Sequence, residues 1–216
     1  ITLRDDTLIS TGANSQLAAI RLETNQGVNA AMNRGLREVR GEYVCFSAAD
    51  DLVTRDFARR SLDVLAGYPA ASFCFSDVAV LLGDSGVMRQ SPLFLSERPC
   101  MLSPADMKRC LDRTYYHLPS HTILYQREAL LAVGGFIEEL RWIADWFVNY
   151  VLAFRNGACY VPQVLAYYRV SADSYSASGA RQARVQRDLI YRMLDLLESD
   201  AFRDVANDFF SGLELL

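Results

Sequence analysis

Apolar residues recur along this chain in two periods, one typical of buried strands and one typical of amphipathic helices. Short runs rich in β-branched and aromatic residues predict strands at 43–46, 72–82, 122–126, 160–161 and 164–169. Apolar positions three and four residues apart predict helices at 29–40, 54–65, 143–155 and 181–197. This alternation predicts an α/β fold whose mostly parallel sheet is covered on both faces, with 43–46 as its central strand.

Turn and capping residues place the remaining elements. Ser103 and Pro104 predict the start of a helix that reaches residue 111, because Ser favours the N-cap and Pro the first helical position. A helix at 128–133 should end at Gly134-Gly135. The other predicted segments are strand 1–4, helix 14–20, strand 20–23, turn 83–86, loop 92–104 and polar hinge 174–179.

The composition is that of an ordinary globular protein, with 216 residues, 51% hydrophobic and 22% charged. The net charge of −4 argues against a nucleic-acid partner, which would usually require a basic patch. Five scattered cysteines without CxxC spacing predict reduced thiols in a cytoplasmic protein. No stretch approaches the roughly 20 apolar residues that cross a bilayer.

The segment GEYVCFSAADD, residues 41–51, carries the strongest chemical signal. Its apolar strand ends in the adjacent carboxylates of Asp50 and Asp51. Ligands bind at the carboxyl ends of strands in open α/β sheets, and paired carboxylates suit a hard divalent cation that carries phosphate oxygens. The alternative is structural, because Asp51 could be the N-cap of a helix over 52–65.

Five further motifs accompany this segment in a fixed order. They are RDDTLIST (4–11), NQGVNAAMNRG (25–35), GGF (134–136), IADW (143–146) and YRVSADSYS (168–176). Together the six resemble the motifs of family 2 glycosyltransferases, whose GT-A fold is a Rossmann-like α/β/α sandwich. The resemblance covers residues 1–176 and leaves 177–216 as a C-terminal helical extension. The family's first strand ordinarily precedes residue 1, so the domain is expected to lack that strand.

The resemblance implies an inverting hexosyltransferase of class EC 2.4, of the kind that builds cell-surface polysaccharides. Its donor would be a nucleotide diphosphate sugar, and its acceptor a hydroxyl of a saccharide or lipid-linked molecule. Mg²⁺ or Mn²⁺ would offset the charge of the diphosphate leaving group, and Asp50 matches the Asp that holds the metal. Asp145 matches the catalytic base. The structural alternative for Asp145 is an acidic residue favoured in the first turn of a helix.

The same resemblance assigns donor or nucleotide binding to five residues: Asp5, Asp6, Asn33, Asp51 and Arg169. Asp5 and Asp6 match an acidic pair that meets the nucleobase, and Arg169 could bind the diphosphate. Each has a structural alternative. The acidic pair could form a turn after a strand, and Arg169 could form an internal ion pair.

Two positions depart from the family pattern. Ala48 replaces the first Asp of the DxD motif, and Ser171 stands where the family often has His, a better metal ligand. These departures favour a second hypothesis, a GT-A module that binds nucleotide sugars or acts as a scaffold without turnover. Asp50 and Asp145 oppose it. A third class, Mg²⁺-dependent phosphoryl enzymes, would need a Gly-rich phosphate loop or a nucleophilic Asp motif, and the sequence has neither.

Two weaker candidates for the acceptor site are His121 and Trp146. His121 and His117 precede the GGF motif, where the family forms its acceptor pocket, although a loop histidine without a catalytic role is the simpler interpretation. Trp146 and Trp142 flank Asp145, so either could stack on a sugar ring or pack in the core.

The predicted helix at 181–197 carries an apolar stripe that needs a partner surface. The stripe could pack on the domain, form a homodimer or rest on a membrane. Acidic residues along the helix disfavour a membrane anchor. Together with the reduced cysteines, this predicts a cytoplasmic protein. Peripheral association with the inner face of the membrane is a second possibility.

Overall fold

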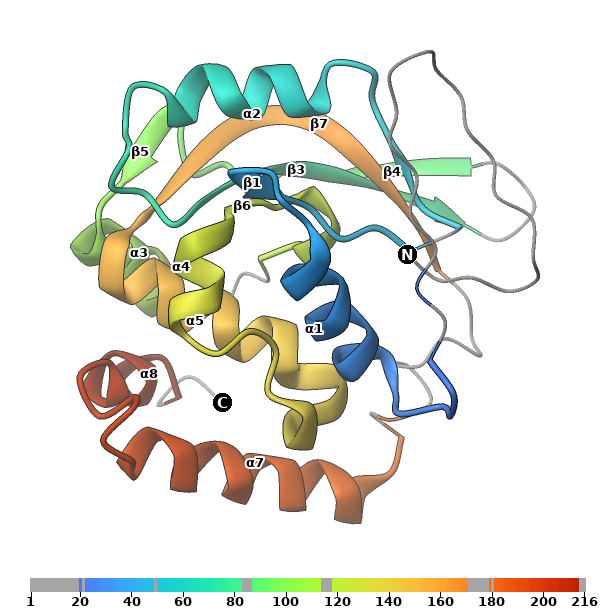
Figure 1. Cartoon of the computed structure of the whole chain (residues 1–216). Coiled ribbons are helices and arrows are strands. Elements are labelled where there is room, and N and C mark those ends of the chain that lie inside the picture. Colours follow the sequence, from blue (N-terminus) through green and yellow to red (C-terminus); the bar gives the residue numbers. More distant parts are fainter. Residues whose placement is uncertain are drawn as a thin grey trace.

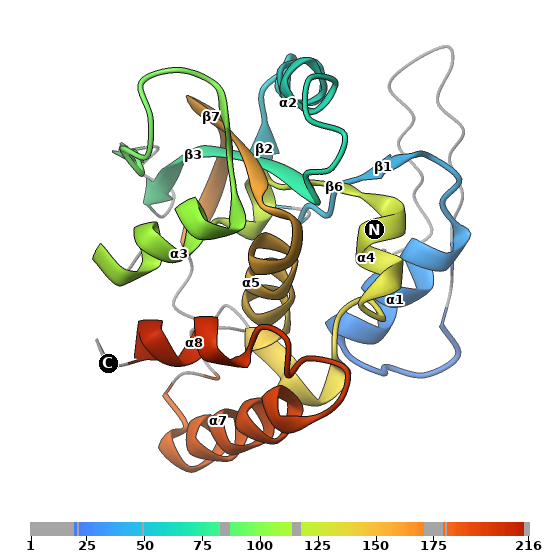
Figure 2. The ribbon, with the colours of Figure 1, turned by 90° about the vertical axis from the view of Figure 1, so that its left-hand side faces the viewer.

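The computed structural model describes residues 20, 22–48, 50–82, 87–113, 118–170, 179 and 181–213. These residues form a curved seven-stranded sheet with helices on both faces. Helix α2 covers one face, whereas α1, α4 and α5 lie against the other (Figure 1). Helices α7 and α8 form a further layer on the far side of α5 (Figure 2).

The strands are β1 (Tyr43–Val44), β2 (Leu52–Val53), β3 (Phe73–Leu82), β4 (Val87–Ser91), β5 (Cys100–Leu102), β6 (Leu124–Gln126) and β7 (Ala158–Val170). The helices are α1 (Val28–Glu38), α2 (Phe57–Leu65), α3 (Pro104–Arg113), α4 (Arg127–Ala132), α5 (Ala144–Asn156), α7 (Ala183–Glu198) and α8 (Ala206–Leu213). The 3₁₀ turn η2 (Ser120–Thr122) precedes β6, and the 3₁₀ turn η3 (Glu138–Ile143) lies between α4 and α5.

The centre of the sheet is the parallel pair β3 and β7. The strand order is β1-β6-β3-β7-β2, with β4 paired to β3 and β5 paired to β7. These other pairings are antiparallel. The predicted α/β class is confirmed, but the described sheet is mixed rather than mostly parallel. Strand β1, predicted as central, lies at one end of this order, because a short apolar run indicates burial without identifying its neighbours.

Alternate side chains of β3 enter two separate cores. Phe73 and Phe75 belong to the larger core, together with Phe147 of α5. Cys74, between them, points to the smaller core that contains Leu65 of α2. Because successive strand residues face opposite sides of a sheet, one strand anchors both helical layers.

Strand β7 is one element where the sequence predicts two, at 160–161 and 164–169. The residues left between the two predicted strands are Pro162, which cannot donate a hydrogen bond to a sheet, and Gln163. The structure keeps the strand continuous through a bulge: Val161 lies opposite Ser76, and Val164 lies opposite Asp77. The two residues between Val161 and Val164 are thereby accommodated without ending the strand.

Two other predictions change, and several cannot be compared with the structure. The predicted loop 92–104 contains strand β5, which pairs with β7. Ile20, Leu22 and Glu23 form no strand. Strand 1–4, turn 83–86, most of helix 14–20 and most of hinge 174–179 lie outside the described residues.

The C-terminal helices pack on the domain itself. Met193 and Leu197 of α7 and Phe209 of α8 are buried in the same core as Phe147. The apolar stripe of α7 therefore packs on the domain, one of the three surfaces predicted for it. Dimerisation through this helix and peripheral membrane association stay predictions. None of the helices in the described part of the chain combines the length and apolarity that a membrane span requires.

Helix α3 begins as its sequence predicts. The Ser103 hydroxyl accepts a hydrogen bond from the Asp106 backbone N–H (3.2 Å), and the Asp106 carboxylate accepts one from the Ser103 backbone N–H (2.9 Å). This reciprocal pair is a capping box, with Asp in the third position. Hydrogen bonds from the Ser103 hydroxyl and backbone, and then Arg109, lower the pKa of Asp106.

Replacing Asp106 by Ala is expected to lower the free energy of unfolding by about 1 kcal/mol at pH 7. Because the folded-state pKa lies below the usual 3.8, this contribution is present above that value and is lost as the pH falls through the folded-state pKa. Urea unfolding at pH 7 and pH 3 measures both effects. Asp63→Ala is the matched control, since Asp63 is an exposed helical carboxylate whose nitrogen–oxygen distance to Arg59 is 3.5 Å. An equal loss in both variants would contradict the capping role.

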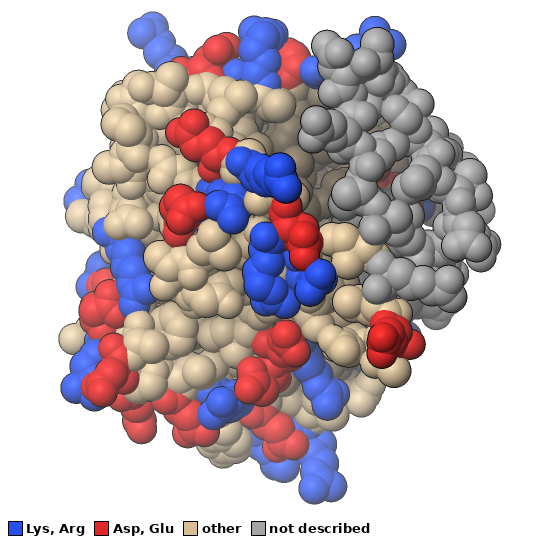
Figure 3. Space-filling view, viewed as in Figure 1, with Lys and Arg blue, Asp and Glu red and all other residues tan. Residues whose placement is uncertain are grey.

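Acidic and basic side chains are interspersed on the face that carries α1 and α4 (Figure 3). Two ion pairs there are Arg34 with Glu38 (2.7 Å) and Arg127 with Glu128 (2.5 Å). The Arg34–Glu38 pair is exposed, and exposed pairs contribute about 0–1 kcal/mol each, so this pair adds little to stability.

Candidate functional site

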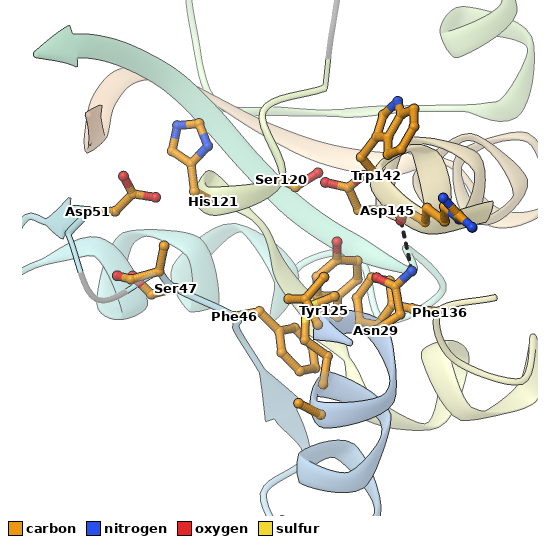
Figure 4. A pocket seen from close by; sticks show the side chains of 15 residues that line it. Asn29, Phe46, Ser47, Asp51, Ser120, His121, Tyr125, Phe136, Trp142 and Asp145 are labelled. Carbon is orange, nitrogen blue, oxygen red and sulfur yellow. Dashed lines mark hydrogen bonds between the residues drawn. The ribbon is translucent and has the colours of Figure 1, made fainter. Parts of the chain in front are cut away.

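A pocket of about 380 Å³ opens between α1, the segment after β1, η2 and the start of α5. Asp51 and His121 lie at one end, and Trp142 and Asp145 lie at the other (Figure 4). Three of the predicted site residues, Asp51, His121 and Asp145, therefore line one pocket although they come from distant parts of the sequence.

Asp51 faces the pocket because β2 pairs with β7. This pairing sets Leu52 opposite Tyr167, so the Asp51 carboxylate accepts a hydrogen bond from the Arg169 backbone N–H at 3.1 Å. The predicted helix over 52–65 is shorter, since α2 begins at Phe57 and Leu52 lies in a strand. Asp51 is therefore a pocket residue and not a helix N-cap.

Burial raises the pKa of the Asp51 carboxyl group. The hydrogen bond from the Arg169 backbone opposes that shift, the negative charge of Asp50 adds to it, and the Arg169 charge opposes it. The structure thus brings Asp50, Asp51 and Arg169 into electrostatic contact. Of these three residues, Asp51 lines the pocket.

Asp50 itself is exposed, and Asp51 rather than Asp50 lines the pocket. Within the described ranges, no three His, Cys, Asp or Glu side chains are grouped to hold a metal ion by themselves. Two neighbouring carboxylates nevertheless fit a hard divalent cation, which commonly keeps waters and phosphate oxygens as its other ligands.

Asp145 lies in the first turn of α5, as predicted, next to a buried row of polar groups. Tyr125 donates its hydroxyl hydrogen to Asn149 (2.6 Å), and the Asn149 amide donates to the Ser120 hydroxyl (2.9 Å). Burial, and then the negative charge of Asp145, raise the pKa of Tyr125 well above its usual value. The Tyr125 hydroxyl therefore stays neutral. Tyr125 and Ser120 both line the pocket that Asp145 lines.

The turn before Asp145 is strained. Arg141 has φ 49° and ψ −118°, a conformation that residues with a side chain rarely adopt. The Asn29 side-chain amide donates to the Arg141 carbonyl at 2.8 Å (dashed line in Figure 4). Backbone strain of this kind is found at functional sites, where the surrounding structure holds it in place. Arg141 lies inside η3, directly before Trp142 and four residues before Asp145.

Asn33, assigned to donor binding by its motif, lies outside the pocket. Its amide donates to the Phe136 carbonyl (2.7 Å) and its carbonyl accepts from the Phe136 N–H (2.8 Å). The neighbouring Gly135 has φ +75°, and a Cβ there would lie within 2.4 Å of the Asn33 Oδ1. Asn33 therefore joins α1 to the GGF segment.

The two residues predicted for the acceptor site, His121 and Trp146, lie in different surroundings. His121 lines the pocket, and its ring lies 4.9 Å from that of Tyr168. Trp146 packs instead against Tyr150 (4.9 Å) and Phe209 (5.8 Å), so it belongs to the core and not to the pocket wall. Asp5, Asp6, His117 and Ser171 lie outside the described residues.

Sequence patterns missed several pocket residues: Asn29, Ser120, Tyr125 and Arg141. Asn29 falls between the fixed positions of its motif, and Tyr125 is indistinguishable from a core residue of a strand. Arg141 could not be found because nothing in a sequence marks a positive φ at Arg. The sequence did point to Trp142, because it lies near Asp145, but it left open whether this residue stacks on a sugar or packs in the core.

Comparisons with known proteins agree with this architecture. Residues 8–134 match the sequence profile described as "Glycosyl transferase family 2". No curated protein matches the chain. Among solved structures, S. aureus TarS in complex with UDP-GlcNAc has a TM-score of 0.57 at 16% identity, over 88% of this chain and 55% of that one. TarS in complex with UDP has a TM-score of 0.55 at 19% identity, over 83% and 48%.

This chain thus spans about half the length of the TarS structures that it matches. At such low identity, the likeness establishes the fold, a GT-A type α/β sandwich, as the motifs implied. The sequence profile covers more than half of the chain and includes the α1 motif and residues 41–51. On these grounds, the chain belongs to glycosyl transferase family 2.

Proposed function

We propose that this chain transfers a sugar, with inversion, from a nucleotide diphosphate sugar to an acceptor hydroxyl. The observation that carries the proposal is the pocket itself, with an Asp51–Arg169 contact at one end and Asp145 at the other. A donor would place its diphosphate at the first end and its anomeric carbon toward the second. TarS, a structural neighbour, binds UDP-GlcNAc, which favours a nucleotide sugar as the donor class.

At the diphosphate end, Asp50 and Asp51 would hold Mg²⁺ or Mn²⁺, which would neutralise part of the leaving-group charge. The backbone hydrogen bond from Arg169 fixes the Asp51 carboxylate, and the Arg169 guanidinium adds positive charge near the diphosphate. Asp5 and Asp6 keep their proposed place at the nucleobase.

At the other end, Asp145 would accept the proton of the acceptor hydroxyl. The acceptor oxygen attacks the anomeric carbon from the face opposite the diphosphate, and the electrons of the broken carbon–oxygen bond leave with the nucleoside diphosphate. A displacement of this geometry inverts the anomeric configuration. The neutral Tyr125 and the Ser120 hydroxyl line the wall beside the reacting oxygen.

One observation favours the alternative of a binding module without turnover. Ala48 lines the pocket at the position where the family motif has its first Asp, so that carboxylate is missing from the wall. Asp145 stands against it, because a module that only binds the donor needs no carboxylate at the acceptor end.

Release of nucleoside diphosphate separates the two functions. The protein is incubated with UDP-, GDP- and dTDP-sugars and Mn²⁺, with and without saccharide acceptors, and product configuration is read by NMR. A transferase releases the diphosphate of one donor and forms a product of inverted configuration. Donor binding without any release would support the module instead.

Replacing Asp51 by Asn is expected to weaken metal-dependent donor binding about 10- to 100-fold, as losing a charged oxygen contact does. Isothermal calorimetry with and without Mn²⁺ measures this change. The effect should vanish without the metal, and Asp63→Asn, on the exposed face of α2, should bind as the wild type does. Equal binding by Asp51→Asn in the presence of Mn²⁺ would remove Asp51 from the donor site.

A further inference from the structure

We propose that Trp142 forms the acceptor-binding wall of the pocket and that Gln186 of the C-terminal helix α7 positions it. The inference rests on the proposed function and deepens it, since it assigns a saccharide ring to the acceptor end. It also gives the residues after 178 a part in the site.

Trp142 has the position that such a wall requires. It follows the strained Arg141 and precedes Asp145 by three residues, and it lines the pocket. Figure 4 shows Trp142 and Asp145 at the same end, away from Asp51. A group bound against this indole therefore lies beside the proposed base and away from the diphosphate end.

Two contacts from the C-terminal segment fix the indole. Its Nε1–H donates a hydrogen bond to the Gln186 Oε1 at 3.1 Å. The backbone of Gly179 presses on the six-membered ring, because a Cβ there would lie 2.4 Å from Cε3, 2.5 Å from Cδ2 and 2.6 Å from Cζ3. Position 179 therefore has room only for glycine. The indole is held at its N–H edge by Gln186 and over one face of its six-membered ring by Gly179.

The chemistry of the wall favours a pyranose. An indole has a broad apolar face, and a sugar ring presents C–H groups on its faces and hydroxyls around its rim. A ring stacked on Trp142 could direct one rim hydroxyl to the Asp145 carboxylate. The other tryptophan near the base, Trp146, packs against Tyr150 and Phe209 in the core and leaves this role to Trp142.

Gln186 is a positioning residue in this account, because it acts through Trp142. Losing one neutral hydrogen bond is expected to weaken acceptor binding about 2- to 10-fold. Gln186→Leu removes the acceptor oxygen of the bond. Gln186→Glu keeps an oxygen for the indole N–H, so it should restore binding.

The test uses the full chain with Trp146→Phe, which leaves Trp142 as the one remaining tryptophan of the two. Its emission is recorded while UDP, GDP and dTDP are each titrated with Mn²⁺. The methyl glycosides of glucose, galactose, mannose and N-acetylglucosamine are then titrated in the presence of the nucleotide that binds. We expect at least one glycoside to shift the emission with saturation. The affinity for that glycoside should fall 2- to 10-fold in Gln186→Leu and return in Gln186→Glu, with nucleotide affinity unchanged in both.

If one of the three nucleotides bound but no glycoside shifted the emission, the Trp142 wall would be overturned and the proposed function would stand. Equal glycoside affinity in Gln186→Leu and the parent protein would overturn the role of Gln186. If the parent protein bound none of UDP, GDP and dTDP, the proposed function would fail, and the inference with it.

Discussion

Replacing Asp145 by Asn is expected to lower sugar transfer by about 10²- to 10⁴-fold, the usual contribution of a general base. Asparagine has nearly the same shape, but it cannot take the proton of the acceptor hydroxyl. Donor binding should stay close to that of the wild type, because the diphosphate contacts lie at the other end of the pocket. Rates of product formation and calorimetric affinities for the donor measure the two effects separately.

A matched control is Glu139→Gln. Glu139 belongs to the η3 turn that precedes Asp145, but its side chain is 63% exposed and lies 3.9 Å from Arg192. Its replacement should leave transfer unchanged. Transfer by Asp145→Asn at the wild-type rate would remove Asp145 from the mechanism.

Replacing Asn33 by Leu is expected to lower the free energy of unfolding by about 2–5 kcal/mol. The substitution keeps the size of the side chain but leaves the buried N–H and carbonyl of Phe136 without their partner, and each unpaired group costs about 1–3 kcal/mol. Chemical denaturation measures the loss. Arg34→Ala, one position along α1, removes an exposed ion pair and should change stability by no more than about 1 kcal/mol.

This experiment also decides between two roles for the motif of α1. If Asn33→Leu unfolded like the wild type and lost nucleotide binding, Asn33 would contact the donor as its motif suggested. Loss of stability with donor affinity retained in the folded fraction supports the link between α1 and the GGF segment.

Local signals predicted the helices well. Ser103 as N-cap with Pro104 after it predicted the start of α3, and Gly134-Gly135 predicted the end of α4. These helix ends depend on hydrogen bonds between neighbours in sequence. The position of Asp145 in the first turn of α5 was likewise predicted by local pattern. The family was identified from six ordered motifs, and the sequence profile confirms it.

Contacts between distant segments explain most of the differences. The bulge beside Pro162 depends on the register with β3, which the sequence of β7 does not contain. Strand β2 forms only because β7 lies beside it, and that pairing turns Asp51 toward the pocket. The separate roles of Trp142 and Trp146 depend on where α7 and α8 pack.

The places of the motif residues depend on distant contacts in the same way. A motif records that a position has a preferred residue type but not which partner that residue contacts. Asn33 and Asp51 were assigned together to the donor. The structure places Asp51 on the pocket wall and Asn33 against a backbone segment about 100 residues away in sequence.

The proposed function requires this pocket to bind a nucleotide diphosphate sugar with the help of a divalent cation. Calorimetric titration of UDP-, GDP- and dTDP-sugars into the wild-type protein, with and without Mn²⁺, measures this binding. We predict saturable binding of one nucleotide class that is strengthened by Mn²⁺ and weakened in Asp51→Asn. If the folded protein bound none of these donors, with or without the metal, the pocket would not be a donor site.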